Sequence, residues 1–160
     1  MIDGPYFALT LVAALGSGVM AGVFFAFSAS VMRTLGALPW KQGLITMQKL
    51  NTLILNPVFL GVFMGTTLLS AVLAVMTLVR WPDGGAWELL TGCVLYLVGC
   101  FGVTAAANVP RNAALEKLDP ESAESAEPWQ RYVSEWTAWN HVRAGAALAG
   151  CAAMVLALAA

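Results

Sequence analysis

Charged side chains are scarce in this chain of 160 residues. Only 11% of its residues are Asp, Glu, Lys or Arg, about half the share that is usual in soluble domains. The formal net charge is −1 at pH 7, so the chain has no excess of positive charge with which to attract a nucleic acid backbone. The composition therefore argues against a soluble domain and against a nucleic-acid-binding protein.

Residues that bind metals or form disulfides are also few. The chain has one His and three Cys, and no CxxC motif. Because Cys93, Cys100 and Cys151 lie in apolar stretches, we expect buried thiols and no disulfide framework. We expect no metal site and no cofactor. A haem would have only His141, with a Met or Cys, as axial ligands.

Long apolar stretches are what the chain has in abundance. Hydrophobic residues make up 59% of the sequence and the mean hydropathy is +0.76. Four blocks contain no Asp, Glu, Lys, Arg or His: residues 5–32, 50–79, 89–109 and 144–160. A helix needs about 20 apolar residues to cross a bilayer, and the backbone must be helical there because lipid offers it no hydrogen-bond partner. We predict one all-α domain, residues 1–160, folded as a four-transmembrane-helix bundle with spans at 6–32, 57–79, 87–107 and 136–159.

The connections between these spans differ in character. In residues 40–55, apolar side chains recur at helical spacing, which predicts an amphipathic segment at the membrane interface; these side chains are Leu44, Met47, Leu50 and Ile54. Asn56 and Pro57 read as an N-cap and the first residue of the second span. Residues 109–128 form a polar connection that holds five of the nine acidic residues. We expect the third helix to end near Pro110, which disfavours helix continuation.

The basic residues predict the orientation in the membrane. Six of them lie in the first and third connections and only Arg80 lies in the second; the six are Arg33, Lys41, Lys49, Arg111, Lys117 and Arg131. The positive-inside rule then predicts a multi-pass protein of a bacterial-type inner or plasma membrane, with both termini outside the cytoplasm.

Small residues in the first span predict close helix contacts. They recur at every fourth position, which lets another helix approach closely in lipid; they are Ala14, Gly18, Gly22, Ala26 and Ser30. The pattern fits contacts within one chain and contacts in a homo-oligomer equally well. Besides a possible second copy, the expected partners are the lipid bilayer and a lipophilic small molecule.

The start of the last span is the best candidate site. Residues 144–160 provide only about 25 Å of helix, so we expect this span to include the turn that holds Asn140, His141 and Arg143. A charged side chain at the edge of the hydrocarbon must face protein or a wet cavity. We therefore predict a polar pocket at the cytoplasmic end of the bundle. A purely structural reading stays open, in which Arg143 reaches lipid phosphates and the nearby Trp residues lie in an interfacial belt.

Four short motifs resemble a known family. They are FFAFS-x-x-VM at 24–32, MQ-x-x-N-x(4)-NP-x-F at 47–59, NVP-x-N at 108–112 and W-x-x-WNH-x-R at 136–143. Together, in this order, they resemble the DUF1772, or anthrone oxygenase-like, family of small membrane proteins. The resemblance implies oxidation of an anthrone to an anthraquinone with O₂ and without a metal or flavin.

The implied chemistry gives the candidate residues their roles. An anthrone loses a proton from its methylene group to give a delocalised anion that reacts with O₂. His141 is the candidate base, and Arg143 and Asn140, with Asn51 or Asn108, are candidates to stabilise the oxyanion. The remaining candidates for substrate binding are Phe24, Gln48, Asn112, Trp136 and Trp139. Two other classes of function remain open: a small-solute or proton transporter, and a non-catalytic accessory or cofactor-binding subunit.

Overall fold

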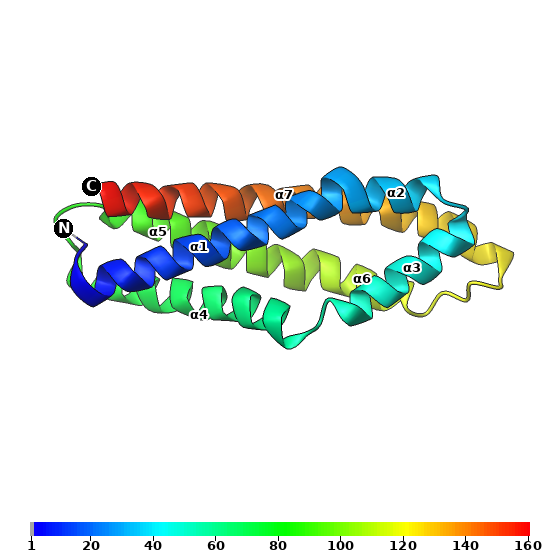
Figure 1. Cartoon of the computed structure of the whole chain (residues 1–160), viewed down its shortest axis with the longest axis horizontal. Coiled ribbons are helices and arrows are strands. Elements are labelled where there is room, and N and C mark those ends of the chain that lie inside the picture. Colours follow the sequence, from blue (N-terminus) through cyan, green and yellow to red (C-terminus); the bar gives the residue numbers. More distant parts are fainter. Residues whose placement is uncertain (1) are drawn as a thin grey trace.

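The computed structural model describes residues 2–160, and this part of the chain folds into helices joined by short connections (Figure 1). Four helical segments are long and apolar enough to cross a membrane: Gly4–Ala37, Pro57–Arg80, Ala86–Leu115 and Ala123–Ala159. The all-α prediction with four long apolar helices is therefore confirmed.

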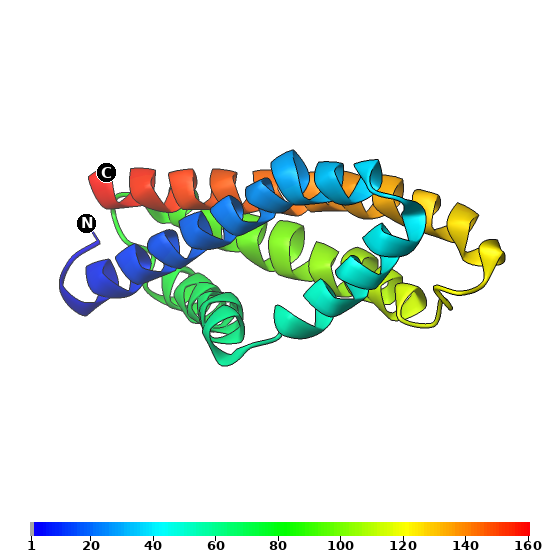
Figure 2. The ribbon, with the colours of Figure 1, turned by 45° about the vertical axis from the view of Figure 1, so that its right-hand side comes forward.

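The four long helices form a ring. Helix α1 (Gly4–Ala26) packs against α4 (Pro57–Arg80) and α7 (Ala126–Ala159), and α5 (Ala86–Val94) packs against the same two helices. Both termini lie at one end of the molecule, and α3 (Trp40–Leu53) lies at the other (Figure 1). Figure 2 shows α3 running obliquely from α2 down to the start of α4.

Two of the long helices continue through π-helical turns. Helix α1 passes through η1 (Phe27–Val31) into α2 (Met32–Ala37). Helix α5 likewise passes through η2 (Leu95–Gly102) and η3 (Thr104–Asn108) into α6 (Val109–Leu115). Both helices therefore extend past the predicted ends at residues 32 and 107.

The prediction that Pro110 ends the third helix is wrong. The N–H of Val109 bonds to the carbonyl oxygen of Thr104, five residues back, so a widened turn directly precedes the proline. Pro110 is the second residue of α6, and the widened turn before it makes room for a ring that would clash with a carbonyl one turn back in a regular helix.

The last helix extends beyond the predicted membrane span, residues 136–159, at its N-terminal end. Helix α7 begins at Ala126 rather than near residue 136 and contains 34 residues. The predicted polar connection shrinks accordingly to a short loop and η4 (Ala123–Ser125). The added turns are helical because Trp129, Tyr132 and Trp136 recur on one face and are buried. The whole helix is about 51 Å long, and Arg143 lies on its buried face together with Trp136 and Asn140.

Helix α3 is amphipathic, as predicted, and packs against α2, α6 and α7. Its Leu44 and Met47 are buried. A Cβ at Gly43 would lie 2.6 Å from the carbonyl oxygen of Leu35, so only glycine allows this approach. The predicted N-cap is confirmed as well: Asn56 Oδ1 accepts hydrogen bonds from the N–H groups of Val58 at 3.1 Å and Phe59 at 3.0 Å.

Three clusters of buried side chains follow one another along the bundle. One lies near the termini and includes Leu73, Leu89 and Met154. A middle cluster includes Phe24, Phe63, Tyr96 and Ala147. The third joins α3 to α7 and includes Leu44, Met47, Trp129 and Trp136. The candidate site lies where the middle cluster meets the third.

Candidate functional site

Arg143 lies inside the helix ring, with only 7% of its surface exposed. It belongs to the inner face of α7, on which Trp136, Asn140 and Ala147 are also buried. These positions are three or four residues apart, which places them on one stripe of a helix. The helix geometry therefore directs the guanidinium toward α1 and η3.

The contacts of Arg143 do not include a carboxylate. Its Nε–H donates to Asn140 Oδ1 at 2.7 Å and its Nη1 donates to Thr104 Oγ1 at 3.3 Å. The guanidinium carbon lies 3.9 Å from the centroid of the Phe24 ring and 4.9 Å from that of Trp136. The ion pairs found among residues 2–160 all join other residues. A guanidinium has five N–H donors, so several remain for a ligand.

Asn140 fixes the direction of this guanidinium. Its Nδ2 donates to the carbonyl oxygen of Phe24 at 2.7 Å and to Ser28 Oγ. With the amide nitrogen held on α1 and η1, Asn140 Oδ1 is turned toward Arg143. The Asn140 side chain thus links α7 to the first helix and also orients the Arg143 guanidinium.

A cavity of about 90 Å³ lies in front of Arg143. Its polar wall consists of Arg143, Asn51, Thr104 and Asn112. Its apolar wall consists of Val23, Phe24, Phe27, Met47, Leu50, Ile54, Leu55, Phe59, Val109 and Trp136.

Two asparagine side chains add hydrogen-bond donors to this cavity. Asn112 Oδ1 accepts from Tyr132 Oη at 3.0 Å and from Trp136 Nε1 at 2.8 Å. Because its oxygen is occupied twice, the Asn112 amide nitrogen is left for the cavity. The buried Asn51 Nδ2 has no partner among the described residues. Three side chains therefore present N–H groups, and the cavity lining includes no carboxylate. Such a lining favours an oxyanion.

The structure brings together six of the residues predicted from the sequence. Asn140 orients Arg143. The other five line the cavity: Phe24, Asn51, Asn112, Trp136 and Arg143. The prediction from the sequence did not include Thr104, Phe27 and Tyr132. Thr104 lies one turn before Asn108 and two turns before Asn112, so its helical spacing was a usable signal. Tyr132 has the same relation to Trp136.

His141 does not share this cavity. It is exposed and lies against surface hollows beside Ser28, Arg33 and Gly22. Two residues along a helix correspond to a rotation of about 200°, so His141 and Arg143 point to nearly opposite sides of α7. The prediction that one face of the helix brings both His141 and Arg143 into a single pocket is therefore wrong.

Three further candidates have other contacts. Trp139 is 40% exposed and lies outside the cavity, with the Arg111 guanidinium 6.0 Å from its ring centroid. Gln48 Nε2 donates to the carbonyl oxygens of Leu115 at 3.0 Å and Leu118 at 3.1 Å. Asn108 is fully buried and donates to the carbonyl oxygen of Trp136 at 3.3 Å. Gln48 and Asn108 therefore join helices around the site, and Trp139 lies outside it.

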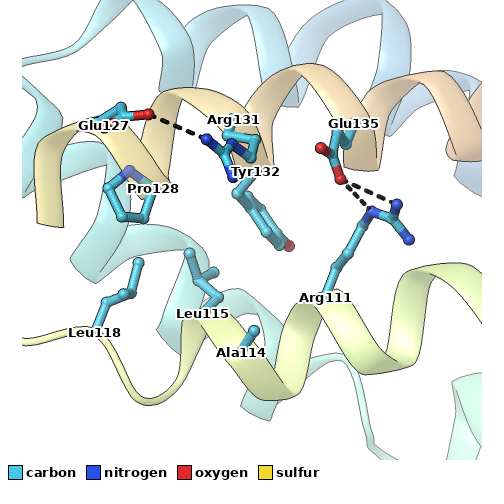
Figure 3. Close-up of a pocket in the computed structure, with 9 residues that line it drawn as sticks. All are labelled: Arg111, Ala114, Leu115, Leu118, Glu127, Pro128, Arg131, Tyr132 and Glu135. Carbon is cyan, nitrogen blue, oxygen red and sulfur yellow. Dashed lines mark hydrogen bonds and ion pairs between the residues drawn. The ribbon is translucent and has the colours of Figure 1, made fainter.

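A groove lies on the other side of Tyr132, between α6 and α7 (Figure 3). Its apolar floor includes Ala114, Leu115, Leu118 and Pro128. The basic residues at its edges are paired: Arg111 with Glu135 at 3.0 Å and Arg131 with Glu127 at 3.1 Å. The groove therefore lacks the unpaired positive charge that distinguishes the inner cavity.

Residues 59–153, more than half of the chain, match the model of the anthrone oxygenase family. The chain belongs to the anthrone oxygenase family. Comparisons with curated proteins and with solved structures find no match. The anthrone oxygenase match includes Thr104, Asn112, Trp136, Asn140 and Arg143, and it leaves out the part of the cavity that α1 and α3 provide.

Proposed function

We propose that this chain is a membrane-embedded oxygenase that binds a lipophilic, anthrone-like aromatic compound as its anion and brings it to react with O₂. One observation carries the proposal: Arg143 is a buried cation whose contacts include no carboxylate. The family match supports oxygenase-type chemistry, and the four apolar helices support a membrane location.

The energetics of burial favour a negatively charged ligand. Removing a charged group from water costs several kcal/mol unless other charges and hydrogen bonds compensate. The rings of Phe24 and Trp136 offset part of this cost by cation–π attraction. A ligand oxyanion would supply the missing charge, and the amide groups of Asn51 and Asn112 would bind the same oxygen.

The chemistry requires little more than stabilising this anion. Loss of one methylene proton converts an anthrone into an enolate whose negative charge is shared between the oxygen and the opposite ring carbon. That carbon reacts with O₂, one oxygen atom becomes the new carbonyl oxygen, and the other leaves as water with the two methylene hydrogens. The balance is one anthrone plus one O₂ giving one anthraquinone plus one water.

In this proposal the anthrone loses its first proton at the membrane surface, and no base in the cavity removes it. His141 lies on the outer side of α7, and the cavity is lined by amide, hydroxyl and guanidinium groups together with apolar side chains. Arg143 favours the ionised ligand over the neutral one, so binding itself selects the reactive form.

Turnover of 1,8-dihydroxyanthrone by the protein in lipid nanodiscs tests the proposal. We expect O₂ uptake and formation of the corresponding quinone in a one-to-one ratio, well above autoxidation in empty nanodiscs. Arg143→Met should lower the rate by about 100-fold or more, the size of effect that follows from removing a central oxyanion donor. Lys49→Met, which removes an exposed cation, is the matched control and should keep the wild-type rate. Wild-type turnover by Arg143→Met would overturn the proposal.

A further inference from the structure

We infer that the cavity opens sideways into the membrane, through a mouth between Leu55 and Val109, and that its ligand enters from the lipid. The route follows from the walls of the cavity alone. Only the identity of the compound that travels along it rests on the function proposed above.

The exposure of the lining residues locates the mouth. Leu55 is 62% exposed and Val109 is 52% exposed, whereas Met47 and Trp136, on the opposite walls, are 1% and 2% exposed. Leu55 belongs to the corner between α3 and α4, and Val109 is the first residue of α6. The cavity therefore reaches the surface between that corner and the third long helix.

The other walls are closed by hydrogen bonds. Gln48 on α3 donates to the carbonyl oxygens of Leu115 and Leu118, which joins α3 to the end of α6. On the next wall, Asn112 accepts from Tyr132 and Trp136, which closes the cavity toward the groove of Figure 3. These contacts separate the cavity from the end of the molecule where the Lys41–Glu121 ion pair and the polar loop before η4 lie.

Exposed apolar side chains lie close to Leu55 in the sequence. Leu53 is 69% exposed, Val58 is 78% exposed and Leu60 is 37% exposed. Asn56, which caps α4, marks the position at which the second apolar span begins. The mouth therefore lies where a bilayer would place the boundary between its head groups and its acyl chains.

This position gives the site a basis for selectivity. A buried cation that opened to water would meet chloride and phosphate, which are abundant and small. An opening at the acyl-chain boundary admits anions only when they are also lipophilic. Leu55 and Val109 thus determine specificity by limiting which compounds reach Arg143, and not by contacting the reacting atoms.

A thiol placed in the cavity tests the route without any substrate. Thr104→Cys is a conservative change in size at a residue that lines the cavity and contacts Arg143. In proteoliposomes it is treated with neutral methyl methanethiosulfonate, with the unsubstituted protein as the blank for the native cysteines. We expect labelling of Cys at this position, and a rate at least tenfold slower when Leu55→Trp and Val109→Trp are added. Val58→Trp is the matched control, because Val58 is exposed nearby and does not line the cavity; it should leave the rate unchanged.

A charged reagent of similar size provides the second arm. The anionic 2-sulfonatoethyl methanethiosulfonate is attracted by Arg143, so slow labelling by it cannot result from charge repulsion and would indicate a route through lipid. Labelling by the anion as fast as by the neutral reagent would overturn the inference. The inference would also be overturned if the two tryptophan substitutions left the labelling rate unchanged, or if Thr104→Cys itself were not labelled. Lack of oxygenase turnover alone would leave the route standing and would count only against the proposed function.

Discussion

Asn140 and Arg143 act as one unit: Asn140 Oδ1 accepts the Nε–H of Arg143 at 2.7 Å while its amide nitrogen is held by the carbonyl oxygen of Phe24, also at 2.7 Å. An amide can serve both partners because it carries a donor and an acceptor. This arrangement leaves Arg143 charged, oriented and without a carboxylate, which is the state the proposed function needs.

Asn140→Asp should therefore weaken binding of an anionic ligand although it barely changes the shape of the side chain. The new carboxylate would neutralise Arg143 and would repel the carbonyl oxygen of Phe24 that now accepts a hydrogen bond. We expect the dissociation constant for 1,8-dihydroxyanthraquinone, a stable ring compound with ionisable hydroxyls, to rise at least tenfold. Thr104→Val removes one hydrogen bond to Arg143 and leaves the charge of the site unchanged. It should raise the dissociation constant by about fivefold or less. Equal effects of the two substitutions would contradict the electrostatic explanation.

His141→Ala should leave turnover within about twofold of wild type, since effects far from a functional group are small. The imidazole lies on the outer side of α7, in hollows that do not include Arg143. Steady-state O₂ uptake with 1,8-dihydroxyanthrone measures this directly. A loss of a hundredfold or more, in a variant that keeps the wild-type melting temperature, would restore His141 as the base.

Tyr132→Phe should weaken ligand binding only modestly. The substitution keeps the aromatic ring that stacks on Trp129, with centroids 5.8 Å apart, and removes the hydroxyl that donates to Asn112. Trp136 continues to hold Asn112, so the cost is about one hydrogen bond, or a two- to tenfold rise in the dissociation constant. Isothermal titration with 1,8-dihydroxyanthraquinone gives the value. A rise of about a hundredfold or more would contradict this account, because it would mean that Trp136 alone does not hold Asn112 in place.

Two glycines with opposite surroundings test the packing of the bundle. A Cβ at Gly92 would lie 2.7 Å from Met154 Cγ and 2.9 Å from the carbonyl oxygen of Gly150, whereas a Cβ at Gly61 would meet nothing within 4 Å. Gly92→Ala should therefore destabilise the protein by about 1–3 kcal/mol through overpacking between α5 and α7. Gly61→Ala should be neutral or slightly stabilising, because alanine favours a helix. Thermal unfolding in detergent compares the two, and a larger loss for Gly61→Ala would contradict this packing.

Much of the fold was predictable because the membrane restricts the backbone. The four blocks without charged residues predicted the four long helices, and the apolar spacing around Leu44 and Met47 predicted α3. The helix ends were not predictable in the same way. Pro110 is compatible with a continuous helix only because a π-turn precedes it, and a π-turn has no clear pattern in one sequence.

The candidate site was predictable in its central residues and not in its boundaries. Asn140, Arg143 and Trp136 share a helix stripe, which the spacing alone indicates. His141 follows Asn140 directly, and closeness in sequence concealed that it faces the other side of α7. Trp139 was misjudged for the same reason. The orientation of the termini relative to the cytoplasm stays a prediction from the basic residues.

The most direct measurement is the visible titration of 1,8-dihydroxyanthraquinone bound to the protein in nanodiscs. If Arg143 supplies the charge that stabilises the bound anion, the apparent pKa of the bound dye should fall by about one unit or more below its value in empty nanodiscs. In Arg143→Met the two pKa values should coincide. A bound dye that ionises at the same pH in wild type and in Arg143→Met would contradict the account.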